Sequence, residues 1–164
     1  MKTLKTVALP VLALSVTLLL PSVARAQQAD KGQWYAFGAA GAQTGSAGAQ
    51  VGGGIGYERL IYKGLGWGVD FGGFGGPDAR AIASANGFYH FRQSASQKLV
   101  PFGTAGVSGL VGCGDSCGGT WAFNFGAGMN YWFRSNRGLR LEARDYVLAD
   151  YGSHKWEMRI GFAF

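Results

Sequence analysis

The sequence predicts an all-β protein: an eight-stranded antiparallel up-and-down transmembrane β-barrel that follows a cleaved signal peptide. Three observations predict this fold. Residues 155–164 alternate strictly between large apolar side chains and charged or small ones, which is the period of a β-strand. All 29 glycines lie after residue 26, a density that disfavours helices. No apolar run after residue 26 is long enough for a membrane-spanning helix.

Residues 1–26 have the composition of a secretory signal peptide. Lys2 and Lys5 precede an apolar run from Val7 to Leu20, and Ala24-Arg25-Ala26 fits the small-residue cleavage pattern. The alternative is a membrane-anchoring helix, but the run is short for spanning and leads straight into the cleavage pattern. We therefore expect cleavage after residue 26.

The remaining residues, 27–164, are expected to form one outer-membrane barrel domain. Three of the 15 basic residues and none of the nine acidic ones lie in the leader, which leaves 12 − 9 = +3. Such a small net charge gives no reason to expect a nucleic-acid partner. Eight strands of about ten residues and seven connections fit within this length.

The first four expected strands are recognised by apolar residues at alternate positions, separated by residues typical of turns. In chain order, the residues that share the apolar face are Tyr35, Phe37 and Ala39 in the first strand, Val51, Ile55 and Tyr57 in the second, Trp67, Val69 and Phe71 in the third, and Ala85, Tyr89 and Phe91 in the fourth.

The last four expected strands differ in how clearly they alternate. The fifth, residues 98–109, is blurred by Pro101 and by a run of small residues, since Pro suits only a strand end or bulge. The sixth, residues 121–133, carries large or small apolar side chains at every odd position. The seventh contains Leu139, Leu141, Ala143 and Val147, and the eighth contains Trp156, Met158, Ile160, Phe162 and Phe164.

The opposite face of these strands is small and mostly uncharged, whereas a water-soluble barrel would carry many charges there. It includes Gly38, Gly54, Gly128, Ser84 and Asn124. Small residues suit the crowded lumen of an eight-stranded barrel, because glycine makes room for longer side chains elsewhere. We therefore expect this face to line the lumen and the apolar face to contact lipid.

Seven long charged side chains share the small-residue face and are expected to form a lumen charge network. If position numbers in the last two strands sum to 301, Glu142 lies opposite Arg159 and Arg144 lies opposite Glu157. The network is interpreted as a structural salt-bridge plug, and the alternative is an ion pathway or ligand site. The seven residues are Glu58, Asp70, Arg140, Glu142, Arg144, Glu157 and Arg159.

The connections predict an orientation with both chain ends on the periplasmic side. Tight turns are expected there at residues 62–64, 92–97 and 134–138, and mostly longer outward loops at residues 42–48, 75–80, 110–119 and 149–154. Aromatic residues near the strand ends are placed as an interfacial girdle requires. They are Trp34, Tyr35, Trp67, Trp121, Tyr131, Trp132 and Trp156.

Three segments, Asn124 to Trp132, Gly138 to Tyr146 and Ile160 to Phe164, carry a family resemblance. With the leader, they make the sequence resemble the small outer-membrane β-barrel family that includes OmpX, OmpW-type proteins and the OmpA membrane domain. The resemblance implies a porin-like, monomeric protein of a Gram-negative-type outer membrane, in contact with its lipid. It implies a structural or surface-interaction role without catalytic activity. Ile160, Phe162 and Phe164 resemble the terminal signal that the barrel assembly machinery recognises.

Cys113 and Cys117 lie close together in an expected outward loop. An exported pair at this spacing predicts a disulfide, and no further ligand at zinc-like spacing supports a metal site. The same loop carries a G-x-S-x-G match around Ser116, so one alternative is a surface hydrolase with His154 as base and Asp150 orienting it. The motif needs a strand-turn-helix elbow, and no helix is predicted here.

A third class of protein also fits an alternating barrel: a secreted, lipocalin-like binder whose aromatic residues surround an apolar ligand. The direction of Phe123, Phe125 and Phe162 separates this alternative from a membrane barrel. No phosphate-binding glycine motif occurs, so no cofactor is expected. The outward loops are the expected contact surface for any extracellular ligand. His90 is expected to be a hydrogen-bonded filler of the lumen.

Overall fold

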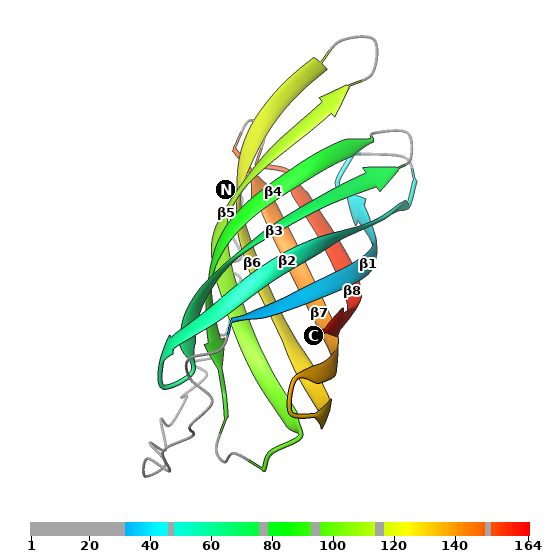
Figure 1. Cartoon of the computed structure of the whole chain (residues 1–164). Helices are drawn as coiled ribbons and strands as arrows, with labels where there is room; N and C mark the ends of the chain where they lie inside the picture. Colours follow the sequence, from blue (N-terminus) through cyan, green and yellow to red (C-terminus); the bar gives the residue numbers. More distant parts are fainter. Residues whose placement is uncertain (1–31, 46–47, 76–78, 93–95, 114–116, 150–151) are drawn as a thin grey trace, which may run out of the picture.

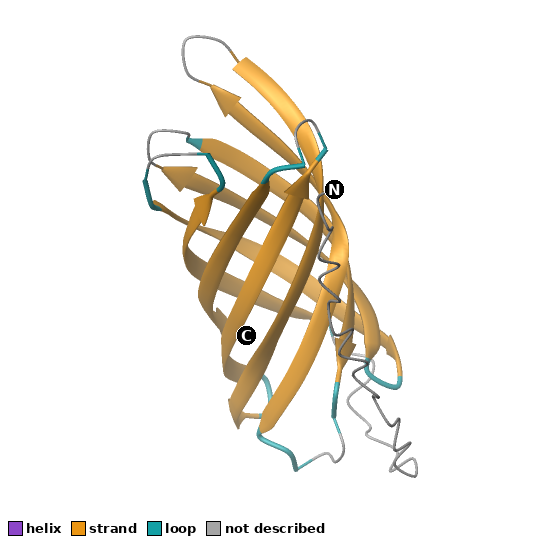
Figure 2. Cartoon of the chain, turned by 180° about the vertical axis from the view of Figure 1, so that it is seen from behind, coloured by secondary structure: helices purple, strands orange, loops and turns teal. Residues whose placement is uncertain are grey.

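A computed structural model of the chain describes residues 32–45, 48–75, 79–92, 96–113, 117–149 and 152–164. These residues form eight β-strands and no helix (Figures 1 and 2). The leader predicted at residues 1–26 lies outside them. The strands are β1 (Gln33–Gln43), β2 (Gln50–Tyr62), β3 (Leu65–Gly75), β4 (Arg80–His90), β5 (Leu99–Cys113), β6 (Cys117–Arg134), β7 (Arg137–Leu148) and β8 (His154–Ala163).

The strands close into one antiparallel up-and-down barrel, as the sequence predicts. Each strand pairs with the next along the chain, and β8 pairs with β1. Beside this seam, Trp34 and Phe164 exchange two backbone hydrogen bonds of 3.1 and 2.8 Å. None of the described residues belongs to a helix long and apolar enough to cross a membrane.

The strand register fixes the width of the barrel. The register can be followed from Gln33 on β1 by moving at each step to the paired residue on the next strand. The residues reached in turn are Glu58, Gly68, Asn86, Gly106, Asn124, Tyr146 and Lys155, and Lys155 pairs with Gln43 on β1. The circuit therefore returns to β1 ten residues further along. With eight strands, this stagger corresponds to a strand tilt of about 40° and to an interior that side chains can fill.

The turn between β2 and β3 shows how local sequence sets this register. Lys63 and Gly64 connect the strands, and both have positive φ, at 44° and 88°. A two-residue hairpin with both central residues in this region matches the twist of antiparallel strands. Gly64 takes this backbone without strain, and Lys63 is the one described non-glycine residue with positive φ.

The hairpin of β5 and β6 corrects the expected loop boundaries. These strands have 15 and 18 residues, and most of the outward loop predicted at residues 110–119 is paired strand. The hairpin extends beyond its neighbours in Figure 1. The outward connections are not generally the longer ones, since residues 91–98 join β4 and β5 at the opposite end. The backbone continues to pair through glycine-rich sequence because pairing needs no particular side chain.

The inner and outer faces are as predicted on six strands, β2, β3, β4, β6, β7 and β8, and no face was predicted for β5. Phe125 and Ile160 are exposed on the outside, whereas Asn124 and Arg159 are buried inside. The prediction is wrong for β1, where Tyr35 and Phe37 point inward and Gly38 points outward.

The β1 error has a physical reason. Both faces of β1 are apolar, so the period separates them without showing which one contacts lipid. The large rings of Tyr35 and Phe37 are needed inside, where they pack against guanidinium groups. Tyr35 is consequently not part of the aromatic girdle.

Candidate functional site: the charged interior of the barrel

Among the described residues, eight charged side chains are buried in the lumen and are arranged so that opposite signs alternate. All seven predicted network residues are buried there, together with Lys155. Four carboxylates and four cations are present, so their formal charges cancel. Following the ion pairs from the end near the chain termini to the opposite end, the order is Glu58, Arg140, Glu142, Arg144, Asp70, Arg159, Glu157 and Lys155.

Glu58 on β2 begins this series. It accepts a hydrogen bond of 2.9 Å from Arg140 Nη1 and lies 3.2 Å from Nε2 of His90. The side-chain amide of Gln33 also donates to it. Arg140 in turn donates from Nε to Glu142 at 3.2 Å. His90 therefore lies in the lumen beside Glu58, as the sequence predicts.

Asp70 on β3 connects the two halves of the network. Its Oδ2 accepts hydrogen bonds of 2.8 Å from Arg144 and from Asn86. Its Oδ1 lies 3.4 Å from both terminal nitrogens of Arg159. Arg144 also donates from Nε to Glu142 at 2.7 Å, so this guanidinium binds two carboxylates.

Glu157 on β8 completes the network. Its oxygens accept hydrogen bonds from Lys155 at 2.8 Å, from the Tyr146 hydroxyl at 3.0 Å and from Arg159. Arg159 also donates to the Tyr146 hydroxyl at 2.5 Å. Each buried charge is thus paired and hydrogen-bonded, which is the condition under which ions are tolerated in a protein interior.

Aromatic rings cover the faces of the buried cations. Arg140 lies 4.0 Å from the ring centre of Phe102 and 4.5 Å from that of Tyr35. Arg159 lies 4.3 Å from Phe37, and the Lys155 ammonium lies 3.7 Å from Phe74. These are cation–π distances, and the rings also exclude water from the ion pairs.

Glycines in the wall make room for these rings. A Cβ added at Gly56 would lie 2.3 Å from the Tyr35 ring. A Cβ added at Gly128 would lie 2.2 Å from the carbonyl oxygen of Leu141 and 2.6 Å from the Phe102 ring. The glycine-rich wall and the large interior side chains are therefore complementary in shape.

The predicted register is confirmed, but the direct ion pairs differ from those expected. Glu142 lies opposite Arg159, and Arg144 lies opposite Glu157. The ion pairs of Glu142 nevertheless run along its own strand to Arg140 and Arg144, and Glu157 likewise pairs with Lys155 and Arg159. Residues two apart on a strand share a face, and an arginine is long enough to span that spacing.

Sequence reasoning missed Lys155 and Tyr146 as members of the network. Lys155 lies at the same alternate positions of β8 as Glu157 and Arg159, so the two-residue period could have predicted that its side chain points into the lumen. Tyr146 is fully buried and holds two charged partners. Its even position in β7, shared with Arg140 and Arg144, is the signal that could have placed it inside.

The hydrolase alternative has no support among the described residues. Ser116 and Asp150 lie outside them. His154 is half exposed on the outer surface, and its Nδ1 lies 2.8 Å from Oδ2 of Asp145. The described residues also contain no group of His, Cys, Asp or Glu side chains able to hold a metal ion.

The two cysteines occupy facing positions. Strand pairing places Cys113 on β5 directly opposite Cys117 on β6. Directly opposed residues in an antiparallel pair have Cα separations within the range that a disulfide requires. The disulfide itself remains a prediction.

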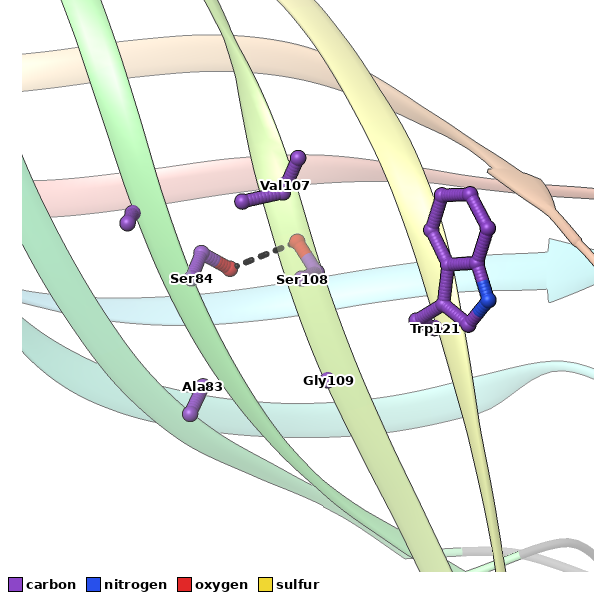
Figure 3. A pocket seen from close by; sticks show the side chains of 7 residues that line it. Ala83, Ser84, Val107, Ser108, Gly109 and Trp121 are labelled. Carbon is purple, nitrogen blue, oxygen red and sulfur yellow. Dashed lines mark hydrogen bonds between the residues drawn. The ribbon is translucent and has the colours of Figure 1, made fainter.

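The outer wall has a shallow hollow over β4, β5 and β6, shown in Figure 3. Small residues such as Ala83 and Gly109 form it, and Trp121 stands at one side. The hydroxyls of Ser84 and Ser108 are engaged inside the barrel, where Ser108 donates to Ser84 at 3.0 Å and accepts from Asn124 at 2.9 Å. The hollow therefore presents an apolar surface rather than a set of reactive groups.

Phe123, Phe125 and Phe162 are all exposed on the outside of the barrel. A lipocalin-like binder requires these rings to line the cavity, so their direction contradicts that alternative. Among the described residues, the six phenylalanine and tyrosine rings buried in the interior pack among charged side chains rather than around an empty apolar cavity. They are Tyr35, Phe37, Phe74, Phe88, Phe102 and Tyr146.

Solved structures similar to this fold include small outer-membrane barrels. The N-terminal β-barrel domain of Pseudomonas aeruginosa OprF is 18% identical over 82% of this chain and 100% of its own, with a TM-score of 0.62. Neisserial surface protein A is 17% identical over 80% and 94%, with a TM-score of 0.60. Pseudomonas aeruginosa OprG is 10% identical over 82% and 95%, with a TM-score of 0.59.

No family model and no curated protein matches the sequence. At these identities the structural likeness concerns the fold. The chain has the fold of a small eight-stranded outer-membrane β-barrel, which confirms the predicted fold class.

Proposed function

We propose that the protein is an integral barrel of the outer membrane of a Gram-negative-type bacterium, with a filled lumen and a structural or surface-interaction role. The observation that carries the proposal is the distribution of side chains across the wall. Trp67, Phe125 and Ile160 exemplify large apolar residues exposed on the outside, while the charged network is buried. An apolar outer surface of this extent is unfavourable in water and suits the hydrocarbon core of a lipid bilayer. The closed barrel can enter that core because its backbone hydrogen bonds are satisfied between its own strands.

The proposal includes an orientation and a set of partners. The barrel end that holds Trp34 and Phe164 faces the periplasm, and residues 27–164 form the mature domain after removal of the leader. Outer-membrane lipid surrounds a monomer. Ile160, Phe162 and Phe164, all exposed on the outside, are the residues that the barrel assembly machinery would contact. The opposite connections are the surface for an extracellular ligand.

A catalytic role is not part of this proposal. The formal charges of the buried acidic and basic side chains in the lumen cancel, and these side chains are already paired with one another. The fold alone does not define a reaction, because function depends on a site.

The proposal predicts that the folded chain needs detergent for extraction and migrates differently on a gel before and after boiling. A charged residue placed on the lipid-facing wall should then destabilise the barrel more, the deeper it lies in the bilayer. Ile160→Arg, in the middle of β8, should destabilise the barrel by about 2–4 kcal/mol in lipid vesicles. Val111→Arg, near the projecting end of β5, should cost only about 0–1 kcal/mol.

Denaturant unfolding in vesicles, followed by tryptophan fluorescence, measures both variants. Val111 is the matched control because its side chain is exposed on the same outer face. A chain that stays soluble without detergent would contradict the proposal. Equal costs for Ile160→Arg and Val111→Arg would contradict it as well.

A further inference from the structure

A ring of basic side chains surrounds the barrel end at which β1 begins and β8 ends. The β2–β3, β4–β5 and β6–β7 hairpins each contribute two of them. Five of the six are exposed and Arg92 is partly exposed. We refer to this set as the basic collar: Arg59, Lys63, Arg92, Lys98, Arg134 and Arg137.

The sequence around the collar contains no acidic residue to balance it. Residues 59–67, 89–99 and 131–139 include neither Asp nor Glu. The nearest carboxylate in β2 is Glu58, which points into the lumen and binds Arg140. The opposite connections contain Asp78, Asp115 and Asp150 in the sequence, and the adjoining strand ends add one partly exposed cation, Arg80. The charge is therefore concentrated at one end of the barrel.

Exposed aromatic residues lie directly beside the collar on the outer wall. Tyr62, Phe91 and Phe133 are exposed at the ends of the same three hairpins. The Lys63 ammonium lies 4.9 Å from the Tyr62 ring centre. Aromatic residues adjoining Lys and Arg are typical of the headgroup level of a bilayer, where long basic side chains extend toward the interface.

From this arrangement we propose that the basic collar binds the headgroups of negatively charged phospholipids and enriches them around this end of the barrel. The inference rests on the proposed function, because it requires a membrane-inserted barrel. Guanidinium groups bind phosphate through paired hydrogen bonds, and clustered cations add long-range attraction to an anionic leaflet. Three hairpins, each with two cations, distribute this attraction around the circumference.

Spin-labelled lipids report which lipid contacts an inserted barrel. The full chain is reconstituted in phosphatidylcholine vesicles that contain a trace of spin-labelled phosphatidylglycerol or phosphatidylcholine. At low salt, we expect phosphatidylglycerol to be selected over phosphatidylcholine by a factor of about two to five. Salt should weaken this selection, because the collar is exposed and its charges are screened.

Neutralising four of the six collar residues should remove most of the selection. In the variant Lys63→Gln/Lys98→Gln/Arg134→Gln/Arg137→Gln, we expect the ratio to fall close to one. Interchanging Lys and Arg at the same four positions keeps the charge and should keep the selection. His154→Gln, on the exposed opposite rim, is the matched control and should change nothing. Variants with one neutralised hairpin give intermediate ratios if the fourfold variant does not fold.

The outcomes separate the inference from the function. Heat-modified gel mobility establishes first whether the chain has inserted. An inserted barrel that shows no preference for phosphatidylglycerol overturns the inference and leaves the function standing, whereas a chain that fails to insert contradicts the function. Loss of the selection in phosphate buffer, but not in chloride at equal ionic strength, would show that the collar binds free phosphate and would also overturn the inference.

Discussion

Glu157 illustrates how the interior keeps its charges. Its two carboxylate oxygens accept hydrogen bonds from Lys155, Arg159 and Tyr146. The rings of Phe37 and Phe74 pack against Arg159 and Lys155, respectively. Removing one member of such a network leaves its partners buried and unpaired, which costs more than the original ion pair contributed.

Glu157→Gln is therefore expected to destabilise the barrel by about 3–5 kcal/mol, because Lys155 and Arg159 lose their shared counter-charge. The matched control is Asp145→Asn, which removes the exposed ion pair with His154 and should cost about 0–1 kcal/mol. Urea unfolding of both variants in lipid vesicles measures the difference. Equal destabilisation by the two substitutions would show that Glu157 is not held in a closed network.

At the residue scale, the sequence predicted where seven of the eight network charges would lie, all except Lys155, but not which partner each would bind. Arg140 and Glu142 stand out because they share a face with glycine, and the period alone places them inside. Choosing Arg140 rather than Arg159 as a partner of Glu142 depends on side-chain reach, which the pattern does not encode. The direction of Tyr35 was likewise undetermined, since β1 has no charged residue to distinguish its faces.

At the scale of the strands, the β5–β6 hairpin differs most from its neighbours. From Cys117 to Thr120, β6 has no strand partner on its β7 side, because β7 ends at Leu148 opposite Ala122. On its other side the hairpin is supported by β4, which pairs with β5 as far as Gly112. Because β6 is unpaired on one side near the tip, a covalent link there would add stability where strand pairing is weakest.

The facing positions of Cys113 and Cys117 predict a disulfide in protein isolated from the cell envelope. Unfolded, unreduced chain should then take up no maleimide label, and reduced chain should take up two. The double variant Cys113→Ser/Cys117→Ser should keep the heat-modifiable barrel but lose hydrogen-exchange protection at the top of β5 and β6. Labelling of both cysteines without reduction would contradict the disulfide.

The alternation of apolar and polar residues predicted that each strand exists, but it did not predict where the strands end. The sixth strand, with Phe123 and Phe125 on one face, was predictable because its period is unbroken. The upper ends of β5 and β6 contain Gly112, Gly118 and Gly119, which carry no side-chain period. Backbone pairing continues there without a signal that sequence reasoning can detect.

For the whole molecule, the filled interior predicts that the barrel does not conduct ions steadily. Eight strands with a stagger of ten residues enclose a narrow interior, and arginine and aromatic side chains fill it. Single-channel recording in a planar bilayer should show no stable openings for the wild-type chain, with a 16-stranded porin as the positive control. Regular openings that change with Glu157→Gln would contradict the filled lumen and identify an ion pathway.

The alternating order of charges in the lumen also constrains how the chain can assemble. Arg140 and Glu58 are separated by 82 positions in the sequence, Arg144 and Asp70 by 74, and Arg159 and Asp70 by 89. A sheet missing its last strands would leave Glu58 and Asp70 without their guanidinium partners. Because the final strands bring these cations, a partial sheet gains little from entering lipid early, and insertion is expected to be concerted with closure of the seam.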